Sequence, residues 1–407
     1  MKMCTKNLSI LYLIGDRGLD LTKGEGYKIH VLKIIDGLKK RGHRVFLLTI
    51  NENPLLPEFE NYVTLRHKYL HFFFHRIFPF TGTLNSINVL LHIIKLNKLY
   101  HFDVIHERFG LYSYGGIIAS KLLRIPHITE INGPGIEEKR LFTKDFTFMQ
   151  KFTAGIIRKF CLKNTGHIVA VSHNLKKFLI DYAVIKHTQT VTVLPNAADV
   201  ESFDKQVDVL ALKASLGLED KFIIVYTGTL QVWYALEDII AALPFVLSEV
   251  PSAYLLIAGE GQAREALEDL ALRLGLSGKV RFLGYINHNK IPELLSIADV
   301  AVAPYKEVGM PFFNSPIKLF EYLGAGKAIV ATNLGQITEI VKDRQTALLV
   351  KPGSKEEFAN AIVRLARDVQ LRNFLEKNAK REAQKYSWTN YAGQLEGIYA
   401  SLLQGNE

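Results

Sequence analysis

Short runs of apolar residues alternate along the chain with longer segments in which apolar positions recur every three to four residues. Uninterrupted apolar runs of this length are typical of buried parallel strands, and the longer period is typical of helices packed on a sheet. The runs lie at residues 8–14, 44–50, 103–106, 127–131, 167–171 and 190–194, and then at residues 222–226, 253–258, 280–283, 300–303, 328–332 and 347–350. The pattern predicts an α/β protein whose parallel sheets are covered by helices on both faces.

The alternation is interrupted once, at Pro195 and Asn196, where a polar and acidic stretch begins that continues to Asp220. Because 407 residues exceed what one compact core accommodates, we predict two doubly wound, Rossmann-like domains. The first spans residues 1–200, the second spans residues 201–385, and a last helix in residues 386–407 is expected to cross back to the first domain. Ligands of such sheets bind at the carboxyl ends of the strands, so candidate residues are sought there.

The cysteines and the apolar runs argue against several classes of protein. Cys4 and Cys161 have no paired spacing, which argues against a disulfide framework or a zinc site and suits a reducing compartment. No run reaches the ~20 apolar residues that a membrane-spanning helix needs. The first run is followed by Gly15, Asp16 and Arg17 instead of a small-residue cleavage site, so we interpret it as a strand and not as a signal peptide. We expect a cytoplasmic protein that uses no metal.

The formal net charge of +10 is distributed unevenly. The stretch that begins at Asn61 and ends at Phe102 has no acidic residue, and it is rich in basic, histidine and aromatic residues. It is either an aromatic-rich connection packed on the surface or a patch that contacts an anionic membrane from its inner side. A positive charge also fits a nucleic-acid binder, but the chain has no recognised nucleic-acid motif.

Two glycine-rich loops follow predicted strands. Gly26 opens the helix after the first strand, and Gly259 and Gly261 precede a helix in the second half. Backbone amides at such helix starts can approach a phosphate closely, although a tight turn alone also explains the glycines. Neither loop completes the dinucleotide fingerprint, because Ile29 and Arg264 stand where its third glycine would be. A nicotinamide-dependent dehydrogenase is therefore disfavoured.

Acidic and amide side chains follow two neighbouring strands of the first half. Glu130 and Asn132 lie at the end of the run at residues 127–131, and Glu107 and Arg108 follow the preceding run. A carboxylate at a strand end suits general acid or base catalysis or the binding of sugar hydroxyls. Glu107 and Arg108 are either on the acceptor side of such a site or form a surface ion pair.

The segment SPIKLFEYLGAGKAIVAT combines features of an anion site. Ser315 suits an N-cap and Pro316 the first helical position, and the free amides there favour an anion. Lys318 adds a positive charge in the first turn, and Glu321 shares its face and suits the two hydroxyls of a ribose. The spacing alone leaves two interpretations open, a nucleotide pocket and an ordinary capped helix with a Lys–Glu pair.

A resemblance to the retaining family 4 glycosyltransferases of the GT-B fold is carried by an ordered series of segments. In the second half these are VTVLPNAADVESF, FIIVYTGTL, AYLLIAGEGQ, VRFLGYI, ADVAVAPY, SPIKLFEYLGAGKAIVAT and ALLVKPGS. The first half contributes GEGYKIHVLKIIDGLKKRGHRV, so the resemblance covers nearly the whole chain. The strand that ends in E-x-N-G-P is similar to members that assemble exopolysaccharide and lipopolysaccharide in the cell envelope.

The resemblance implies a metal-independent enzyme that binds a UDP- or GDP-linked sugar mainly on its second domain and the acceptor on its first. Glu321 would hold the ribose, and the turn before Lys318 would meet the diphosphate. The expected donor-binding residues are Gly26, Gly259, Gly261, Arg264, Gly284, Tyr285, Ser315, Pro316, Lys318 and Glu321. Glu130, Asn132 and Lys318 are the expected catalytic residues.

The chain departs from the family pattern at several positions. Phe313 replaces the first of two glutamates that lie eight positions apart, as is common in members with S-P-x-K-L-F-E-Y. Thr229 and Gln231 stand in a loop where a basic residue is frequent, and Asn132 stands where many members have a histidine. From the whole sequence we expect a transferase that moves a hexose-type sugar, with retention, to a glycan or lipid-linked acceptor. The alternative enzyme is a sugar-nucleotide epimerase of the same architecture.

Overall fold

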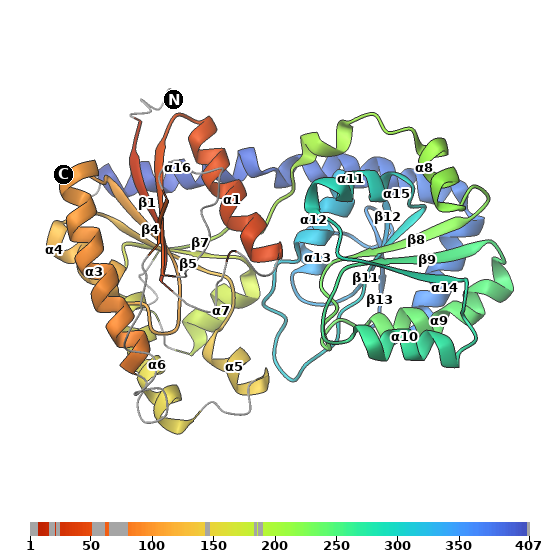
Figure 1. Ribbon diagram of the computed structural model, residues 1–407, viewed down its shortest axis with the longest axis horizontal. Helices are drawn as coiled ribbons and strands as arrows, with labels where there is room; N and C mark the ends of the chain where they lie inside the picture. The colour runs from red at the N-terminus through yellow and green to blue at the C-terminus, as the bar shows by residue number, and fades with distance from the viewer. Residues whose placement is uncertain are drawn as a thin grey trace. The chain divides into compact units, whose positions relative to one another are not determined.

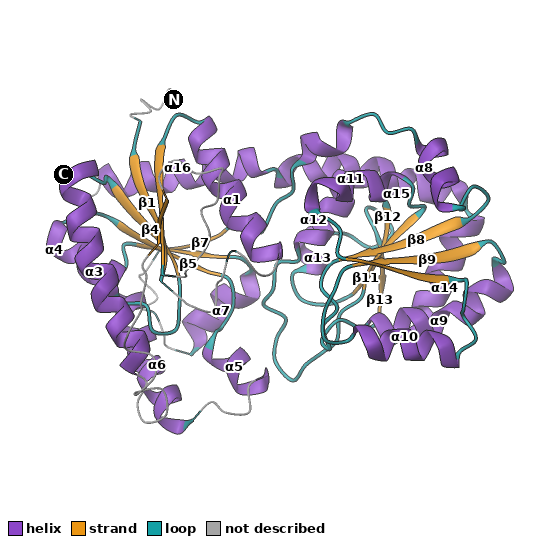
Figure 2. Ribbon diagram, in the orientation of Figure 1, coloured by secondary structure: helices purple, strands orange, loops and turns teal. Residues whose placement is uncertain are grey.

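The computed structural model describes residues 7–15, 21, 25–50, 62–64, 80–142, 147–182, 185 and 190–404. The chain divides into two compact units, of which unit 1 comprises Met1–Pro195 and Trp388–Glu407 and unit 2 comprises Asn196–Ser387. Each unit is a parallel sheet with helices on both faces (Figures 1 and 2). The expected α/β architecture with two doubly wound sheets is thus confirmed.

The sheet of unit 1 has the strand order β3-β2-β1-β4-β5-β6-β7, and every neighbouring pair is parallel. Its strands are β1 (Ser9–Ile14), β2 (Arg44–Thr49), β3 (Tyr62–Thr64), β4 (Val104–Arg108), β5 (His127–Ile131), β6 (His167–Ala170) and β7 (Val191–Val193). The first apolar run is therefore a strand, as predicted. The sequence pattern missed β3, which lies inside the acid-free stretch that begins at Asn61, because three residues are too few to establish an alternation.

Two pairs of helices cover the sheet of unit 1 on opposite faces. Alternate side chains of β1 separate them: Leu11 and Leu13 join the core beneath α3 (Phe80–Tyr100) and α4 (Gly115–Leu123), whereas Tyr12 faces the other side. On that side α1 (Glu25–Lys40) packs against α16 (Trp388–Gln404). The remaining helices in the described part of unit 1 are α5 (Ile136–Phe142), α6 (Phe148–Asn164) and α7 (His173–Asp181).

The sheet of unit 2 has the strand order β10-β9-β8-β11-β12-β13. Its strands are β8 (Phe222–Thr227), β9 (Ala253–Ala258), β10 (Val280–Gly284), β11 (Val300–Ala303), β12 (Ala328–Thr332) and β13 (Leu348–Val350). The helices are α8 (Val209–Leu216), α9 (Leu236–Glu249), α10 (Arg264–Arg273), α11 (Ile291–Ser296), α12 (Ile317–Gly324), α13 (Ile337–Ile340), α14 (Lys355–Arg367) and α15 (Val369–Ala383), with short 3₁₀ turns η1 (Val200–Asp204), η2 (His288–Lys290) and η3 (Gln384–Tyr386). Two apolar clusters, one on each face of the sheet, form its core.

Two boundaries in unit 1 differ from the sequence prediction. Strand β4 continues through Glu107 and Arg108, which had been placed in the loop after it. The apolar period of the sequence predicts a helix over residues 111–123, but α4 begins at Gly115, because the amide of Ser113 turns back to the carbonyl of Gly110. Within the described residues, no helix combines the length and apolar character needed to span a bilayer.

Candidate functional site

The winding of the unit 2 sheet reverses between β8 and β11, the point where doubly wound sheets bind ligands. Lys318, the second residue of α12, reaches the end of β8 from the helix after β11. A Cβ added to Gly228, just beyond β8, would lie only 2.8 Å from the Lys318 amine. The lysine predicted to meet an anion is therefore at the carboxyl edge of the sheet, at its switch point.

Tyrosine side chains hold the Lys318 ammonium in place. Its Nζ donates a 2.6 Å hydrogen bond to the hydroxyl of Tyr226, which donates in turn to the carbonyl of Thr229 at 2.8 Å. The same Nζ lies 3.9 Å from the ring centroid of Tyr226, 4.2 Å from that of Tyr234 and 5.6 Å from that of Tyr305. Cation–π contacts of this kind partly replace the water that a buried ammonium loses.

Burial lowers the pKa of Lys318 well below its usual value, and the carboxylate of Glu321 opposes this shift only in part. Burial also raises the pKa values of Tyr226 and Tyr305, so both stay neutral hydroxyls. The site thus holds a lysine whose charge is poorly compensated. A phosphate at this position would supply the missing negative charge.

The start of α12 differs from the prediction. The structure places Pro316 at the N-cap, where no side-chain cap hydrogen bond forms, so Ser315 is not the N-cap residue. The Ser315 hydroxyl instead accepts a 2.8 Å hydrogen bond from the amide of Asn196, whose side-chain amide donates to the Ser315 carbonyl at 2.6 Å. This double contact ties the turn before α12 to the first residue of unit 2.

Glu321 is buried and bonded to a histidine that the sequence analysis missed. Nε2 of His288, from the η2 turn after β10, lies 2.6 Å from Oε1 of Glu321. Among the described residues Lys318 and Glu321 form no ion pair with each other, and both side chains are less than a tenth exposed. The interpretation as an ordinary capped helix with a Lys–Glu pair therefore does not fit, because neither the side-chain cap nor the pair forms.

Gly259 and Gly261 have a clear packing role. Their φ angles are +146° and +159°, and a Cβ on either would come within 1.8 Å of the carbonyl of Gly228 or 2.2 Å of that of Leu230. Backbone hydrogen bonds join the same loops, from Gly228 to Ala258 and from Leu230 to Glu260. These glycines let the loops after β8 and β9 pack against each other beside the switch point.

The other residues expected near the donor lie at the same sheet edge. Gly284 ends β10 with a φ of +70°, and Tyr285 follows it with 57% of its surface exposed. Arg264 is partly exposed and is paired with two carboxylates, those of Glu260 and Glu268. Its charge is already neutralised, which makes it a weaker candidate for binding phosphate than Lys318.

In unit 1 the predicted residue Glu130 is the centre of a buried polar network. The carboxylate is fully buried and accepts a 2.9 Å hydrogen bond from the hydroxyl of Tyr12. Nε2 of His30 lies 2.7 Å from Oε1, and Nε2 of His106 lies 3.2 Å from Oε2. Arg108 also donates to Oε1, at 3.4 Å.

The predicted partner Asn132 belongs to the same network, because its side-chain amide donates to Oε1 of Glu130. Burial alone would raise the pKa of Glu130, but His30, His106 and Arg108 hold it well below its usual range. An ionised, fully bonded carboxylate cannot donate a proton to a substrate. Glu130 is therefore suited to fixing the histidines, the arginine and the amide around it.

Glu107 and Arg108 lie on opposite faces of β4, as alternation along a strand requires. Glu107 accepts from the hydroxyl of Ser113 and lies 2.9 Å from Nε2 of His127, under α4. Arg108 faces Glu130 on the side of α1 and α16. Both residues are buried, so the alternative of a surface ion pair between them is wrong.

The sequence analysis also missed Glu138, near the start of α5. Its carboxyl oxygens lie against Gly133 in the loop after β5. Burial, reinforced by the charge of Glu137, raises the pKa of Glu138 to about 7. Gly26, on the exposed start of α1, has open space where a Cβ would be.

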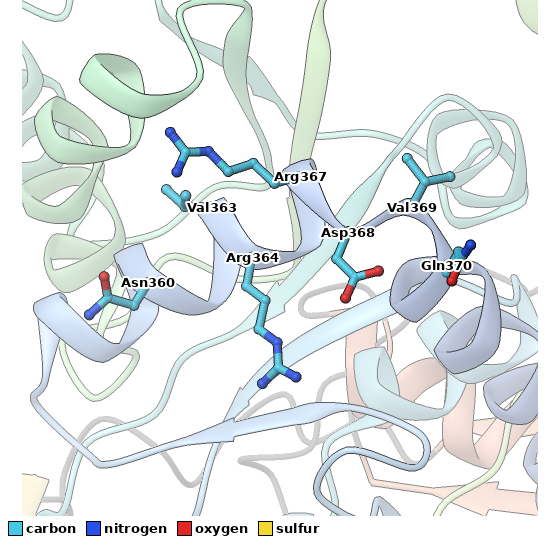
Figure 3. A pocket seen from close by; sticks show the side chains of 7 residues that line it. All are labelled: Asn360, Val363, Arg364, Arg367, Asp368, Val369 and Gln370. Carbon is cyan, nitrogen blue, oxygen red and sulfur yellow. The ribbon is translucent and has the colours of Figure 1, made fainter.

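A shallow surface depression of about 630 Å³ lies in unit 2, where α14 joins α15, and its lining includes neither Lys318 nor Glu321. Figure 3 shows its lining residues, including Arg364, Arg367 and Asp368. In the described part of the chain, no group of three or more histidine, cysteine or acidic residues is placed to hold a metal ion.

Comparisons with known proteins agree over most of the chain. A family model described as "Glycosyltransferase Family 4" matches residues 25–202, and one described as "Glycosyl transferases group 1" matches residues 208–382. An uncharacterized glycosyltransferase of Methanocaldococcus jannaschii, MJ1607, is 28% identical over 93% of this chain and 95% of its own length.

One further relative and one solved structure have names that state a substrate or a ligand. The Escherichia coli UDP-Gal:alpha-D-GlcNAc-diphosphoundecaprenol alpha-1,3-galactosyltransferase is 24% identical over 74% of this chain and 75% of its own. The crystal structure of Anabaena Alr3699/HepE in complex with UDP superposes with a TM-score of 0.74 and 20% identity, covering 97% of this chain and all of that one. None of these relatives is described as an epimerase or a nucleic-acid binder.

Proposed function

The chain belongs to the group 1 glycosyltransferases of the family 4 type, with the GT-B fold, and from this premise we propose that it transfers a hexose-type sugar with retention of configuration. It is a glycosyltransferase that uses a nucleotide-sugar donor. The acceptor that we propose is a glycan or a lipid-linked sugar. The E. coli relative, named for a diphosphoundecaprenol-linked acceptor, supports that choice.

The observation that carries the proposal is the position of Lys318. A buried ammonium at a helix start and at a sheet switch point matches the diphosphate of a nucleotide sugar. Transfer leaves a nucleoside diphosphate with additional negative charge, and a preorganised cation lowers the free energy of that transition state. We assign this role to Lys318 and the backbone amides that follow Ser315 and Pro316.

We propose that the rest of the donor contacts the neighbouring loops of unit 2. Oε1 of Glu321 is bonded to His288, and Oε2 has no partner among the described residues, so this oxygen is the one we assign to the ribose hydroxyls. Gly284 and Tyr285 lie by the base, for which uridine is our first choice because the HepE structure contains UDP. No metal takes part in the reaction that we propose.

Residues of unit 1 are proposed for the sugar and acceptor side. Gly26 leaves room for the donor at the start of α1. Glu130 acts through the groups it holds, and Arg108 and Asn132 are its candidates for contact with the substrate. We place the enzyme at the inner face of a membrane, where the acid-free stretch from Asn61 to Phe102 contacts anionic lipid. Much of that stretch lies outside the described residues, but α3 has Ile87, Leu91 and Leu99 exposed along it.

The test is the substitution Lys318→Ala, followed by turnover with a panel of UDP- and GDP-sugars. We expect turnover to fall by roughly two orders of magnitude or more, the usual effect of removing a transition-state charge contact. Lys290→Ala is the matched control, since that lysine is exposed and pairs with Glu293. Undiminished turnover in a folded Lys318→Ala protein would exclude the diphosphate role.

A further inference from the structure

The outer face of α6 has a stripe of exposed apolar side chains. Phe148, Phe152, Ile156 and Phe160 recur every fourth residue, and Met149 lies beside them. Their exposed fractions run from 44% for Phe160 to 78% for Phe148, and the rings of Phe148 and Phe152 are stacked 6.4 Å apart. A helix on the surface of a soluble protein ordinarily turns such residues toward the core.

The exposed stripe is not the result of a loosely attached helix. Ala154, Cys161 and Leu162 on the opposite face of α6 are almost fully buried. Arg158 donates to Glu137 at 2.8 Å and to the carbonyl of Pro134 at 3.1 Å, and a capping box at Thr147 fixes the first turn. The inner face is thus packed against unit 1, and the apolar stripe is held facing outward.

Two lysines lie within the same stripe. At about 100° per residue, Lys159 and Lys163 project into the arc of about 120° that contains the five apolar side chains. Both lysines are exposed, and α6 contains no acidic residue over its whole length. Figure 1 shows the helix in yellow, as part of unit 1.

We propose that this face of α6, formed by Phe148, Met149, Phe152, Ile156, Phe160, Lys159 and Lys163, rests on the surface of an anionic phospholipid bilayer. Aromatic and aliphatic side chains enter the interface between headgroups and acyl chains, and lysine ammonium groups contact the lipid phosphates. The mixture of cations with apolar residues, and the absence of carboxylates from α6, match this surface in charge. The proposal concerns a surface distinct from the nucleotide site and does not depend on the transfer reaction.

The experiment is vesicle flotation of the full chain at low ionic strength. Vesicles of phosphatidylcholine mixed with phosphatidylglycerol are compared with vesicles of phosphatidylcholine alone. We expect binding only to the anionic vesicles and release by high salt, which screens the lysine contribution. Failure of the wild-type chain to bind anionic vesicles would overturn the proposal.

Variants then locate the binding surface. Because each lysine near an anionic surface strengthens binding about fivefold, Lys159→Ala with Lys163→Ala should weaken it roughly thirtyfold. Phe148→Ser with Phe152→Ser should also weaken it at least tenfold. Phe245→Ser and Lys377→Ala, exposed positions of unit 2, are the matched controls. Binding that survives both α6 variants would overturn the assignment to α6.

A second experiment uses a substitution that leaves this face of α6 apolar. Phe152→Trp should show a blue shift of its added emission on anionic vesicles, whereas Phe245→Trp should not. Size measurement by light scattering tests whether a second copy of the chain covers the stripe instead. A dimer that dissociates in the Phe148→Ser, Phe152→Ser variant, without any vesicle binding by the wild type, would replace the bilayer with a protein partner.

Discussion

At the scale of the residue, Lys318 favours an anionic ligand because its positive charge is poorly compensated within the site. Its ammonium is buried, and its direct partners are one hydroxyl and three aromatic rings. Rings and hydroxyls offset only part of the cost of removing a cation from water. The lowered pKa of Lys318 is the sign of that imbalance, and a diphosphate would remove it.

Nucleotide binding should be accompanied by proton uptake. Because the pKa of Lys318 is low in the free protein and rises beside a phosphate, binding should take up a proton between those two values, and affinity should fall as the pH rises above the lower one. Calorimetry of UDP binding in buffers of different ionisation enthalpy measures this uptake. Lys318→Met should abolish this proton uptake. Any proton exchange by UDP itself should be the same with both proteins.

Glu130 should stabilise unit 1 with a defined pH dependence. Its pKa is lowered in the folded state, so its contribution is present above the unfolded value of about 4.3 and is lost as the pH falls toward the folded value. Glu130→Gln should lower the free energy of unfolding by roughly 3–5 kcal/mol at pH 7, with the difference shrinking below about pH 4. Urea unfolding at pH 7 and below pH 4 measures this difference, with Glu293→Gln as the control because the side chain of Glu293 is 44% exposed.

Glu138 should behave in the opposite way. Its pKa is raised to about 7, so the folded state bears a cost for the ionised form that develops as the pH rises from about 4.3 to 7. Glu138→Gln should therefore stabilise the protein at pH 8, by up to about 3 kcal/mol, and should change nothing at pH 4. Thermal unfolding at the two pH values checks this sign, and equal shifts at both would contradict it.

The sequence predicted the positions of Glu130, Lys318 and Glu321 but not their partners. Strand ends and a helix start are local features, so the run at residues 127–131 and the SPIK turn were sufficient to find these residues. His288 comes from a loop 33 residues before Glu321, and His30 is 100 residues before Glu130. Such contacts depend on strand order and helix packing, which one sequence does not encode locally.

At the scale of the element, the glycines that follow strands lie in two different surroundings. Gly259 lets two loops of unit 2 touch, because a Cβ there would lie 1.8 Å from the carbonyl of Gly228. Gly26 touches nothing within 4 Å of such a Cβ and lies in a helix. The sequence could not separate the two cases, since both glycines follow strands and start helices. Only the backbone of a neighbouring loop distinguishes them.

Alanine substitutions should separate these functions. Gly259→Ala combines a φ of +146° with a backbone clash, so it should destabilise unit 2 by roughly 3 kcal/mol or more. Gly26→Ala should leave the melting temperature unchanged or higher, since alanine suits a helix better, yet should lower turnover if the donor approaches it. Gly397→Ala in α16, also in open space, is the control, which should likewise keep or raise the melting temperature but leave turnover unchanged. Unchanged turnover in Gly26→Ala would remove Gly26 from the donor site.

At the scale of the whole molecule, unit 1 is built from two distant parts of the chain. Helix α16 supplies Tyr399, whose hydroxyl lies 2.6 Å from Nδ1 of His106, and Glu396, which accepts a 2.6 Å hydrogen bond from Nε of Arg41. The structure assigns Trp388–Glu407 to unit 1, and the chain passes out of that unit at Pro195. That a last helix crosses back to the first domain was expected from the sequence, but its contacts were not.

A chain ending at Ser387 should therefore lose one unit and keep the other. The deletion removes four large side chains that are buried in unit 1, those of Trp388, Tyr391, Leu395 and Tyr399. Each contributes about 1.5–3 kcal/mol of burial, so their sum is comparable with the 5–15 kcal/mol that stabilises a typical domain. Unit 1 should no longer unfold cooperatively, whereas unit 2 retains its sheet and the bridge between Ala198 and Ser387.

Nucleotide binding decides whether the donor site belongs to unit 2 alone. Because Lys318, Glu321 and His288 all lie in unit 2, the shortened chain should keep a single thermal transition that UDP or GDP raises. A nucleotide at 100 times its dissociation constant adds about 2.7 kcal/mol to stability, which is a measurable shift. Turnover should be absent, because the proposed acceptor side is lost. A transition that no nucleotide shifts, in a folded unit 2, would mean that residues of unit 1 are needed to bind the donor.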